Sequence, residues 1–360
     1  MRFGDELTAL SLLNGAERAK RRKLSGQRRK NIFLNFIKAA VSSALIYFLL
    51  RRIGVENIWR HLGQANWWWA LLGVATFALS NILGAVQWSI LLRSRDVKLS
   101  TWRVVAFYHV GLFFNNFLIG YIGGDAFRIY DVSKQSGDST TAVSSVVFDR
   151  LVGFFMLTTI AMLMSLFWFR RLSSPKTVGF IAVMLVSWIL LLFFLFHEKS
   201  GKAVGRLFKP LAPAFVTNKV HDIYMAVNHY QHKRGVLVKV FFTSFFVQSL
   251  RIITHYWAAR ALGVNVNLIY FAIFIPIIAL FASLPISFGG IGVREQSGVA
   301  LFSTIGLLAS KVATFEFLAY IIGIIAALPG GLFFAFRKEQ RAEAQSFRNR
   351  IKRSDERRRP

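Results

Sequence analysis

Long apolar stretches, separated by short polar or basic connections, run through most of the chain. They cover the following residues: 32–50, 67–92, 104–122, 142–168, 178–196, 237–262, 268–284, 297–310 and 312–335. Most are long enough for a helix that crosses a bilayer, which needs roughly 20 residues. The regular alternation of apolar and polar residues that marks a membrane β-strand is not seen. Backbone that is neither helical nor part of a closed barrel leaves its N–H and C=O groups without hydrogen bonds in lipid, so these stretches are expected to be helices. The pattern therefore predicts an all-α polytopic membrane protein with six to eight transmembrane helices.

Composition supports this prediction and changes the meaning of the net charge. The chain is 54% hydrophobic and carries a formal net charge of +28. In a soluble protein such a charge favours nucleic-acid binding. Here the basic residues gather outside the apolar stretches, at 20–30, 199–239 and 348–359. Basic segments beside spanning helices mark the cytoplasmic face and its anionic lipids, so we expect a membrane partner and no nucleic acid.

The basic segments also predict the domain organisation. We expect a basic cytoplasmic tail at 1–30, a membrane domain at 31–336 with a basic amphipathic loop at about 199–236, and a second basic cytoplasmic tail at 337–360. The first apolar stretch lacks the small-residue cleavage site of a secretory signal, so it is expected to remain as an anchor. The predicted location is the cytoplasmic (inner) membrane of a bacterium, multi-pass, with both termini in the cytoplasm.

An even number of membrane crossings must separate two cytoplasmic segments. The number of apolar stretches between the N-terminal tail and the basic loop is odd, so they cannot all be simple crossings. Five apolar stretches precede the basic loop, so one of them must enter and leave on the same side. The third stretch runs into a cluster of glycines and is the best candidate. After the loop, 268–284 and 297–310 are expected to make one re-entrant excursion together; two plain crossings would also give an even number, but 297–310 is short for one. The sequence thus predicts two glycine-rich, re-entrant broken segments; eight conventional crossings, with some basic loops outside, are the alternative.

The two predicted re-entrant segments resemble each other. Residues 116–128 align without a gap on residues 282–294. The identical pairs are Leu118 with Leu284, Gly123 with Gly289, Gly124 with Gly290, and Arg128 with Arg294. One segment is predicted to enter from the cytoplasm and the other from outside, which is the arrangement of an inverted repeat with discontinuous helices meeting near the midplane.

Polar residues and glycines concentrate at the first predicted break. They are Asn115, Asn116, Gly123, Gly124, Asp125 and Arg128. Glycine lets the backbone approach a ligand closely, and a helix that restarts there points free N–H groups at an anion. The planar guanidinium of Arg128 suits phosphate, and Asp125 is placed to hold it or to carry a proton. The alternative is a surface loop from which Arg128 reaches the lipid headgroups.

A second cluster of glycines and polar residues, with a proline, marks the other predicted break. They are Pro285, Ser287, Gly289, Gly290, Gly292, Arg294 and Glu295. One proline and three glycines so close together exclude a continuous helix. An arginine beside a glutamate at membrane depth is costly unless it is paired or functional. We predict that both breaks bind a lipid headgroup; an exterior loop with a surface ion pair is the alternative.

Charged residues also interrupt the long apolar stretches. They are Asp149, Arg150, Arg251 and Glu316. Adjacent charges on a helix do not face each other, so Asp149 and Arg150 each need a partner elsewhere. Glu316 is a candidate partner of Arg150, and Arg251 shares a helix face with His255. These residues are expected to link helices or to couple ions to transport.

At these motifs the chain resembles the lysylphosphatidylglycerol synthase transmembrane-domain family, also called flippase-like membrane proteins. The similar segments are NNFLIGYIGGDAFRIYDVSK (115–134), SSVVFDRLVGF (144–154) and SLPISFGGIGVREQSGVALF (283–302). The family often has a proline where this chain has Ile119. In its bifunctional members this domain moves aminoacylated phosphatidylglycerol between leaflets, and a separate soluble domain transfers the amino acid. This chain ends at Pro360 after a short basic tail, so the resemblance implies a transporter without the aminoacyltransferase domain.

The predicted function is therefore to bind an anionic (phospho)lipid or to translocate it between leaflets. One alternative is a membrane enzyme acting on a lipid or polyprenyl phosphate, with a carboxylate as its base. Another is a non-transporting scaffold for a lipid-synthesis enzyme. The sequence has no cysteine, P-loop, nucleophile elbow or H-E-x-x-H motif, so no catalytic residue, cofactor or metal is predicted. A lipid-synthesis enzyme and a second copy of the chain remain open as partners.

Overall fold

The computed structural model describes residues 63–117, 122–168, 224–284 and 290–356. It also describes the single positions and short pieces 56, 60, 179, 182–183, 185–190, 222 and 287. Of 337–356 it describes the backbone alone. The predicted stretch at 32–50 and most of the predicted loop at 199–236 lie outside these residues.

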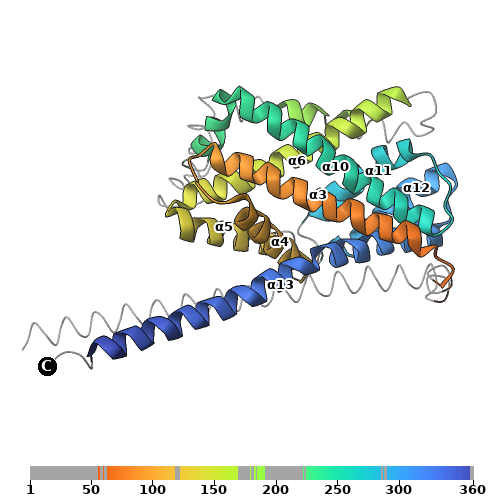
Figure 1. The fold of residues 1–360 in the computed structure, drawn as a ribbon. Helices are drawn as coiled ribbons and strands as arrows, with labels where there is room; N and C mark the ends of the chain where they lie inside the picture. Colours follow the sequence, from red (N-terminus) through yellow and green to blue (C-terminus); the bar gives the residue numbers. More distant parts are fainter. Residues whose placement is uncertain are drawn as a thin grey trace, which may run out of the picture.

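The described residues form helices joined by short connections (Figure 1). The α-helices are α3 (Trp67–Arg93), α4 (Thr101–Phe117), α5 (Ile122–Ser136), α6 (Ser139–Phe167), α10 (Arg234–Ala261), α11 (Leu268–Ser283), α12 (Val293–Phe302) and α13 (Ala309–Glu356). Two short 3-10 helices are η2 (His229–His232) and η4 (Ser303–Ile305). Four segments are long and apolar enough to cross a membrane: α3, α6, α10 and residues 309–336 of α13. The prediction of an all-α polytopic membrane protein is confirmed.

Helices α3 and α10 form an antiparallel pair along the length of the bundle. At one end, the backbone N–H of Asn66 donates to the carbonyl of Ala261, 2.8 Å away. At the other end, the ammonium of Lys233 donates to the carbonyl of Ser94. The end of α3 therefore lies beside the start of α10, and the start of α3 beside the end of α10.

This pair places the two broken hairpins at opposite ends of the bundle (Figure 1). The α4–α5 hairpin follows the end of α3, and the α11–α12 hairpin follows the end of α10. Helices α4 and α11 have 17 and 16 residues. At 1.5 Å per residue each extends about 25 Å, which is shorter than a typical hydrocarbon core of roughly 30 Å. The chain is interrupted between α4 and α5 and between α11 and α12 as predicted, but α5 begins at Ile122, before Gly123 and Gly124 and not after them. The hairpins lie at opposite ends of the bundle (Figure 1), as the predicted repeat requires, and their re-entry into the membrane stays a prediction.

The element predicted at 297–310 is wrong in its limits. Helix α12 begins four residues earlier, at Val293, and ends at Phe302. Gly306 then adopts a left-handed conformation with φ 83°, and α13 begins at Ala309. Glycine favours this conformation because it has no Cβ, so the chain turns here in place of continuing as one apolar helix.

Helix α13 also extends beyond the predicted membrane segment. Its backbone remains helical to Glu356, and Figure 1 shows this last part projecting away from the bundle. The residues between 337 and 356 are mostly charged or polar good helix formers, which explains a helix without an apolar face. The cytoplasmic location of this tail stays a prediction.

Aromatic packing holds the second hairpin against α13. The rings of Phe271 on α11, Phe302 on α12 and Phe315 on α13 are completely buried. Their centroids lie between 5.0 and 5.7 Å apart. Such ring contacts stabilise the bundle beyond the burial of the apolar rings, and they hold the short helix α12 in position against α11 and α13.

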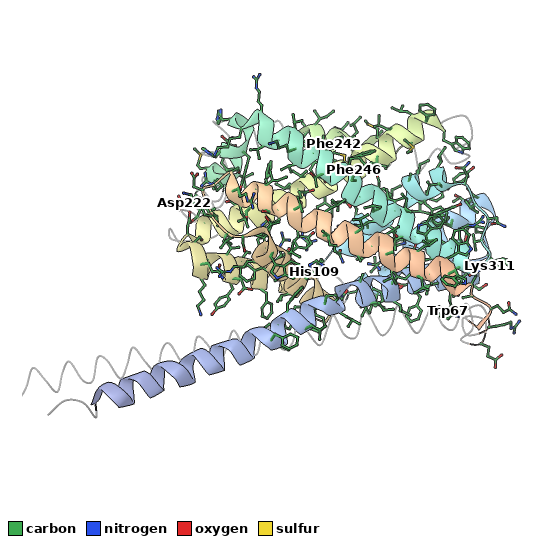
Figure 2. All side chains as sticks on the ribbon, viewed as in Figure 1. Trp67, His109, Asp222, Phe242, Phe246 and Lys311 are labelled. Atoms are coloured by element: carbon green, nitrogen blue, oxygen red, sulfur yellow. The ribbon has the colours of Figure 1, made fainter. Side chains whose placement is uncertain are left out.

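Large apolar side chains also cover the outside of the bundle. Figure 2 shows Phe242 and Phe246 on the outer side of α10, where they are 65% and 42% exposed. Similar residues are exposed along α3 and α13, such as Leu71 and Leu332. An apolar exterior of this extent is expected for helices that face lipid.

The end of the predicted basic loop packs back onto the bundle. Tyr230 of η2 is fully buried, and its ring stacks on that of Phe148 at 4.5 Å. Burial raises the pKa of the Tyr230 hydroxyl above its ordinary value. Val227 joins the same cluster. The described part of this segment therefore belongs to the folded bundle.

An exposed carboxylate caps the start of α6 and provides a local test of the structure. Asp138 accepts hydrogen bonds from the hydroxyl and backbone N–H of Thr141, at 2.5 and 3.0 Å. These bonds lower the pKa of Asp138. Because the folded pKa is the lower one, the cap stabilises the helix above the unfolded pKa and is lost as the pH falls well below about 4.

We expect Asp138→Ala to cost the first turn of α6 about 1 kcal/mol at neutral pH, by loss of this cap. Amide hydrogen exchange of residues 139–146 in purified protein measures the effect. Exchange should be faster in the variant at pH 7, and the difference should shrink as the pH is lowered. The same exchange in both proteins at pH 7 would contradict the assigned cap.

Candidate functional site

A cavity with space for water of about 200 Å³ lies at the centre of the bundle. All eight described α-helices contribute side chains to its wall. Four arginines are among them: Arg128 of α5, Arg150 of α6, Arg251 of α10 and Arg294 of α12. A central cavity with this many cations, inside a bundle with an apolar exterior, is the leading candidate for the functional site.

Arg128 is held by two carboxylates and two aromatic rings, and of its donors Nε alone is buried without a hydrogen-bond partner among the described residues. Its side chain is only 4% exposed, and its guanidinium lies 2.9 Å from Asp149 and 3.4 Å from Asp125. The same group lies over the rings of Trp88 and Tyr108, at 4.2 and 4.5 Å from their centroids. Carboxylates and π-faces together compensate the buried charge. The predicted role of Asp125 in holding Arg128 agrees with this geometry.

Arg150 pairs with Asp125 on the neighbouring helix. Its Nε and Nη2 atoms donate to the two carboxylate oxygens at 2.9 and 3.1 Å, a bidentate arrangement. The prediction that Glu316 is the partner of Arg150 is therefore wrong. The rotation of α6 turns Arg150 toward α5, and Glu316 instead lies 3.2 Å from Nδ1 of His255 on α10. Asp125 thus links both arginines to the start of α5.

Asparagine and glycine shape the first break. The backbone N–H of Gly124 donates to Oδ1 of Asn115 at 2.8 Å, so this amide group bridges the hairpin from α4 to α5. Asn116 lines the cavity, and its side chain donates to the carbonyl of Leu112. One of the N–H groups expected to face an anion is therefore used within the protein.

The second break has a cap of its own. Gly292 has φ 82°, and its backbone N–H donates to the buried carboxylate of Glu295 at 2.6 Å. A carboxylate here satisfies a free N–H and the positive end of α12. Ser287 is buried, and its hydroxyl has no hydrogen-bond partner among the described residues. Gly290 has φ 76°, while Pro285 and Gly289 lie outside the described residues.

The aligned arginines reach the same cavity from different helix positions. Arg294 is the second residue of α12, and its guanidinium lies 5.4 Å from the ring centroid of Tyr320. Arg128 lies six residues after the start of α5. The two hairpins therefore lie at opposite ends of the bundle and are similar in sequence. The aligned arginines, however, lie at different distances from the first residue of their helices.

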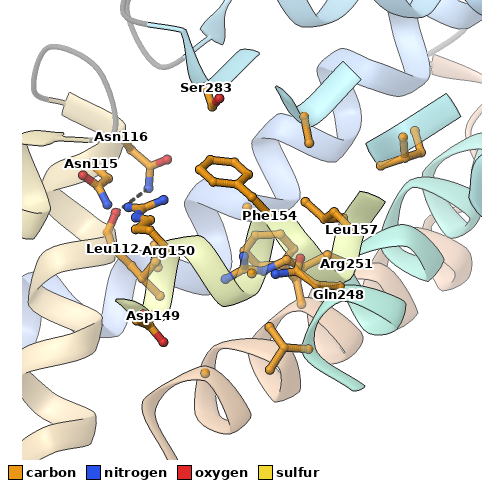
Figure 3. Close-up of a pocket in the computed structure, with 18 of the residues that line it drawn as sticks. Leu112, Asn115, Asn116, Asp149, Arg150, Phe154, Leu157, Gln248, Arg251 and Ser283 are labelled. Atoms are coloured by element: carbon orange, nitrogen blue, oxygen red, sulfur yellow. Dashed lines mark hydrogen bonds between the residues drawn. The ribbon is translucent and has the colours of Figure 1, made fainter. Parts of the chain in front are cut away.

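Arg251 differs from the other arginines described here. It lines the cavity, yet it makes no hydrogen bond or ion pair with any described residue. Gln248 lies three residues earlier on the same face of α10 and is 4% exposed, and its Oε1 has no partner within the described structure. Figure 3 shows both side chains reaching into the cavity from α10.

Several residues of the site were not found from the sequence. Gln87 donates to Asp149 at 2.9 Å, and Trp88 and Tyr108 enclose Arg128. Gln87 and Gln248 carried a usable signal, because an uncharged amide inside an apolar span needs a buried partner or a ligand. The two rings carried none, since aromatic residues are frequent throughout the apolar stretches.

The carboxylates of the site are engaged with protein groups. Asp125 and Asp149 bind arginines, Glu295 binds a backbone N–H, and Glu316 lies beside His255. Within the part of the chain that the structure describes, no three His, Asp or Glu side chains come together as metal ligands. The arrangement is suited to receive an anion.

Comparisons with known proteins add to this description. The family model for the lysylphosphatidylglycerol synthase TM region matches residues 35–331, which include all the residues that line the cavity. A UPF0104 membrane protein of Pyrococcus horikoshii is 21% identical over 320 residues, 82% of this chain and 95% of the relative. A UPF0104 membrane protein of Methanothermobacter thermautotrophicus is 25% identical over 341 residues, 86% of this chain and 93% of the relative.

Proposed function

The chain belongs to the family of the lysylphosphatidylglycerol synthase TM region, and from this premise we propose that it moves an anionic lipid between leaflets. In this proposal the central cavity receives the lipid headgroup while the acyl chains stay in the surrounding bilayer. The lipid is a phospholipid or another lipid with a negatively charged headgroup.

The observation that carries the proposal is the cationic cavity inside an apolar bundle. A charged headgroup crossing bare hydrocarbon loses its hydration, at a cost of several kcal/mol or more. A cavity lined by Arg150, Arg251 and Arg294 replaces part of that hydration with fixed positive charge. The barrier to crossing is therefore lower within the bundle than in the bilayer.

The arrangement of the broken hairpins supports a path from both faces. The α4–α5 and α11–α12 hairpins enter from opposite ends of the bundle, and both contribute to the wall of the cavity. Small movements of one hairpin against the rest would open the cavity to one side at a time. We place the protein in the cytoplasmic membrane of a bacterium with both termini inside, because the basic segments flank the membrane domain.

A transporter is proposed in preference to an enzyme. A membrane enzyme acting on a lipid phosphate needs a free carboxylate base or a metal ion. Asp125, Asp149, Glu295 and Glu316 are each engaged with another protein group, which supports transport over catalysis.

The test is lipid movement in liposomes that contain the purified chain. Fluorescent phosphatidylglycerol is incorporated in both leaflets, and a membrane-impermeant reductant destroys the label on the outside. We expect the inner-leaflet label to be lost severalfold faster with protein than without it. Labelled phosphatidylcholine should respond less, because the cavity is cationic.

Matched arginine variants control this experiment. Arg294→Gln should slow the loss of label, whereas Arg234→Gln, which removes an exposed charge from the outer end of α10, should not. Identical traces for protein-containing and protein-free liposomes would rule out translocation.

A further inference from the structure

We propose that Arg251, assisted by Gln248, is the residue that binds the phosphate of the guest, and that Arg128 is a positioning residue. This inference rests on the proposed function and makes it more specific. The sequence favoured Arg128 and Arg294 as headgroup ligands, because they occupy equivalent positions in the two breaks.

The geometry separates Arg128 from Arg251. Arg128 donates to two carboxylates and lies between two aromatic rings, so a phosphate would have to displace Asp125 or Asp149 to reach it. Displacing a buried carboxylate leaves an uncompensated charge and is costly. Arg251 needs no such exchange, because it has no protein partner among the described residues.

An unpaired arginine at this depth requires a partner. A cation removed from water is strongly destabilised unless an anion or ordered water takes up its N–H groups. Arg251 faces a cavity large enough for several water molecules, so a guest has room beside it. Phosphate oxygens match the planar guanidinium better than a single acceptor does, because two parallel hydrogen bonds form.

Gln248 completes the subsite. Its amide is almost fully buried, lines the cavity and leaves Oε1 without a partner in the described structure. Gly153 of α6 faces this amide, and a Cβ at that position would lie 3.0 Å from Nε2. An amide offers both donors and an acceptor, so it can bind a phosphate oxygen and a neighbouring hydroxyl.

The remaining charges indicate the class of headgroup. Groups of the cavity wall that would bind a headgroup ammonium are already occupied: Asp149 binds Arg128, and the rings of Tyr108 and Tyr320 lie beside Arg128 and Arg294. The free groups at the subsite are the guanidinium of Arg251 and the amide of Gln248. We therefore assign a phosphate-bearing lipid whose headgroup is hydroxylated and carries no positive charge, of the phosphatidylglycerol type.

Binding by the purified full chain tests this assignment. The probes are short-chain phosphatidylglycerol, short-chain phosphatidylcholine, the corresponding diacylglycerol and inorganic phosphate. We expect phosphatidylglycerol to bind most tightly. Arg251→Gln should weaken that binding about tenfold to a hundredfold, the loss expected when a charge-assisted hydrogen bond is removed. Arg251→Lys should fall between, because it keeps the charge and loses the fork.

Controls separate binding from folding. Arg234→Gln removes the same charge from an exposed position of the same helix and should leave the affinity unchanged. All variants should elute and melt like the parent protein, since replacing Arg251 breaks no hydrogen bond of its Nε to a described residue. Equal affinity of the parent and Arg251→Gln for phosphatidylglycerol overturns the inference, as does equal binding of phosphatidylcholine.

The outcomes distinguish this inference from the proposed function. If the protein moves phosphatidylglycerol in liposomes and Arg251→Gln binds it normally, the phosphate ligand lies elsewhere and only the inference fails. If inorganic phosphate binds as tightly as the lipid, the guest is a free anion and the lipid assignment fails. If the parent neither binds nor moves the lipid, both proposals fail.

Discussion

A Gly124→Ala variant is expected to melt far below the parent protein and to give less folded protein. A Cβ at this position would lie 1.8 Å from the carbonyl oxygen of Gly111 and 2.7 Å from the side chain of Asn115. The first of these atoms belongs to the backbone of α4 and cannot rotate away. The added methyl group therefore has to push α4 and α5 apart.

The separation also breaks contacts that the site needs. The hydrogen bond from Gly124 to Asn115 spans the same gap, and Arg128 follows one turn later on α5. Overpacking usually costs 1 to 3 kcal/mol, and we expect this backbone clash to exceed about 3 kcal/mol. Thermal unfolding of detergent-purified protein, together with the yield of folded protein, measures the effect.

Gly235→Ala is the matched control. It makes the same chemical change in a helix where nothing lies within 4 Å of the new methyl group. Its melting temperature should equal or slightly exceed that of the parent, because alanine favours a helix over glycine. If Gly124→Ala melted like Gly235→Ala, the close approach of α4 and α5 would be incorrect.

The second large effect is expected from Asp149→Asn. Asp149 lies 2.9 Å from the guanidinium of Arg128, whose side chain is 4% exposed. Removing one partner of a buried ion pair typically costs 3 to 5 kcal/mol, because the other charge stays buried without compensation. We expect about 3 kcal/mol, the lower end of that range, because Asp125 still contacts Arg128.

A double variant identifies the cause of this loss. Arg128→Met removes the buried charge and leaves an apolar chain between Trp88 and Tyr108, where the guanidinium now lies. Arg128→Met combined with Asp149→Asn should be more stable than the sum of the two single changes predicts. Additive losses of melting temperature would show that the pair is not coupled.

An exposed aspartate gives the control for the charge change. Asp96→Asn makes the same replacement in a turn with φ 61°, a conformation that asparagine tolerates well. Its stability should match that of the parent. A loss comparable to that of Asp149→Asn would point to a general effect of net charge.

Sequence reasoning predicted the breaks well and the polar contacts poorly. Several glycines with a proline close together favour a helix end, so the ends of α4 and α11 were expected near their observed positions. Single residues of these types do not interrupt a helix here, because Pro276 lies inside α11 and Gly123 and Gly124 lie inside α5. The pairing of Arg150 with Asp125 was not predicted. It depends on how α6 is rotated toward α5, and the apolar residues around α6 give no preferred face from which to read that rotation.

The different surroundings of Arg128 and Arg251 also depend on how distant helices pack together. Motif similarity singled out Arg128, while the structure places two carboxylates and two rings around it. Gln248 and Arg251 share a helix face at a spacing that is visible in the sequence. Their lack of a protein partner depends on what the other helices bring to the cavity, and no local pattern contains that information.

The sequence by itself determined the helical class, the membrane environment and the positions of the two hairpin breaks. These properties depend on the length of an apolar run and on glycine or proline within it, which act over a few neighbouring residues. Tertiary structure alone decided which charges pair, which glycines let helices touch, and which arginine of the cavity makes no ion pair with a described residue. Those outcomes follow from the register and rotation of helices distant along the chain, where a shift of one residue would present a different side chain.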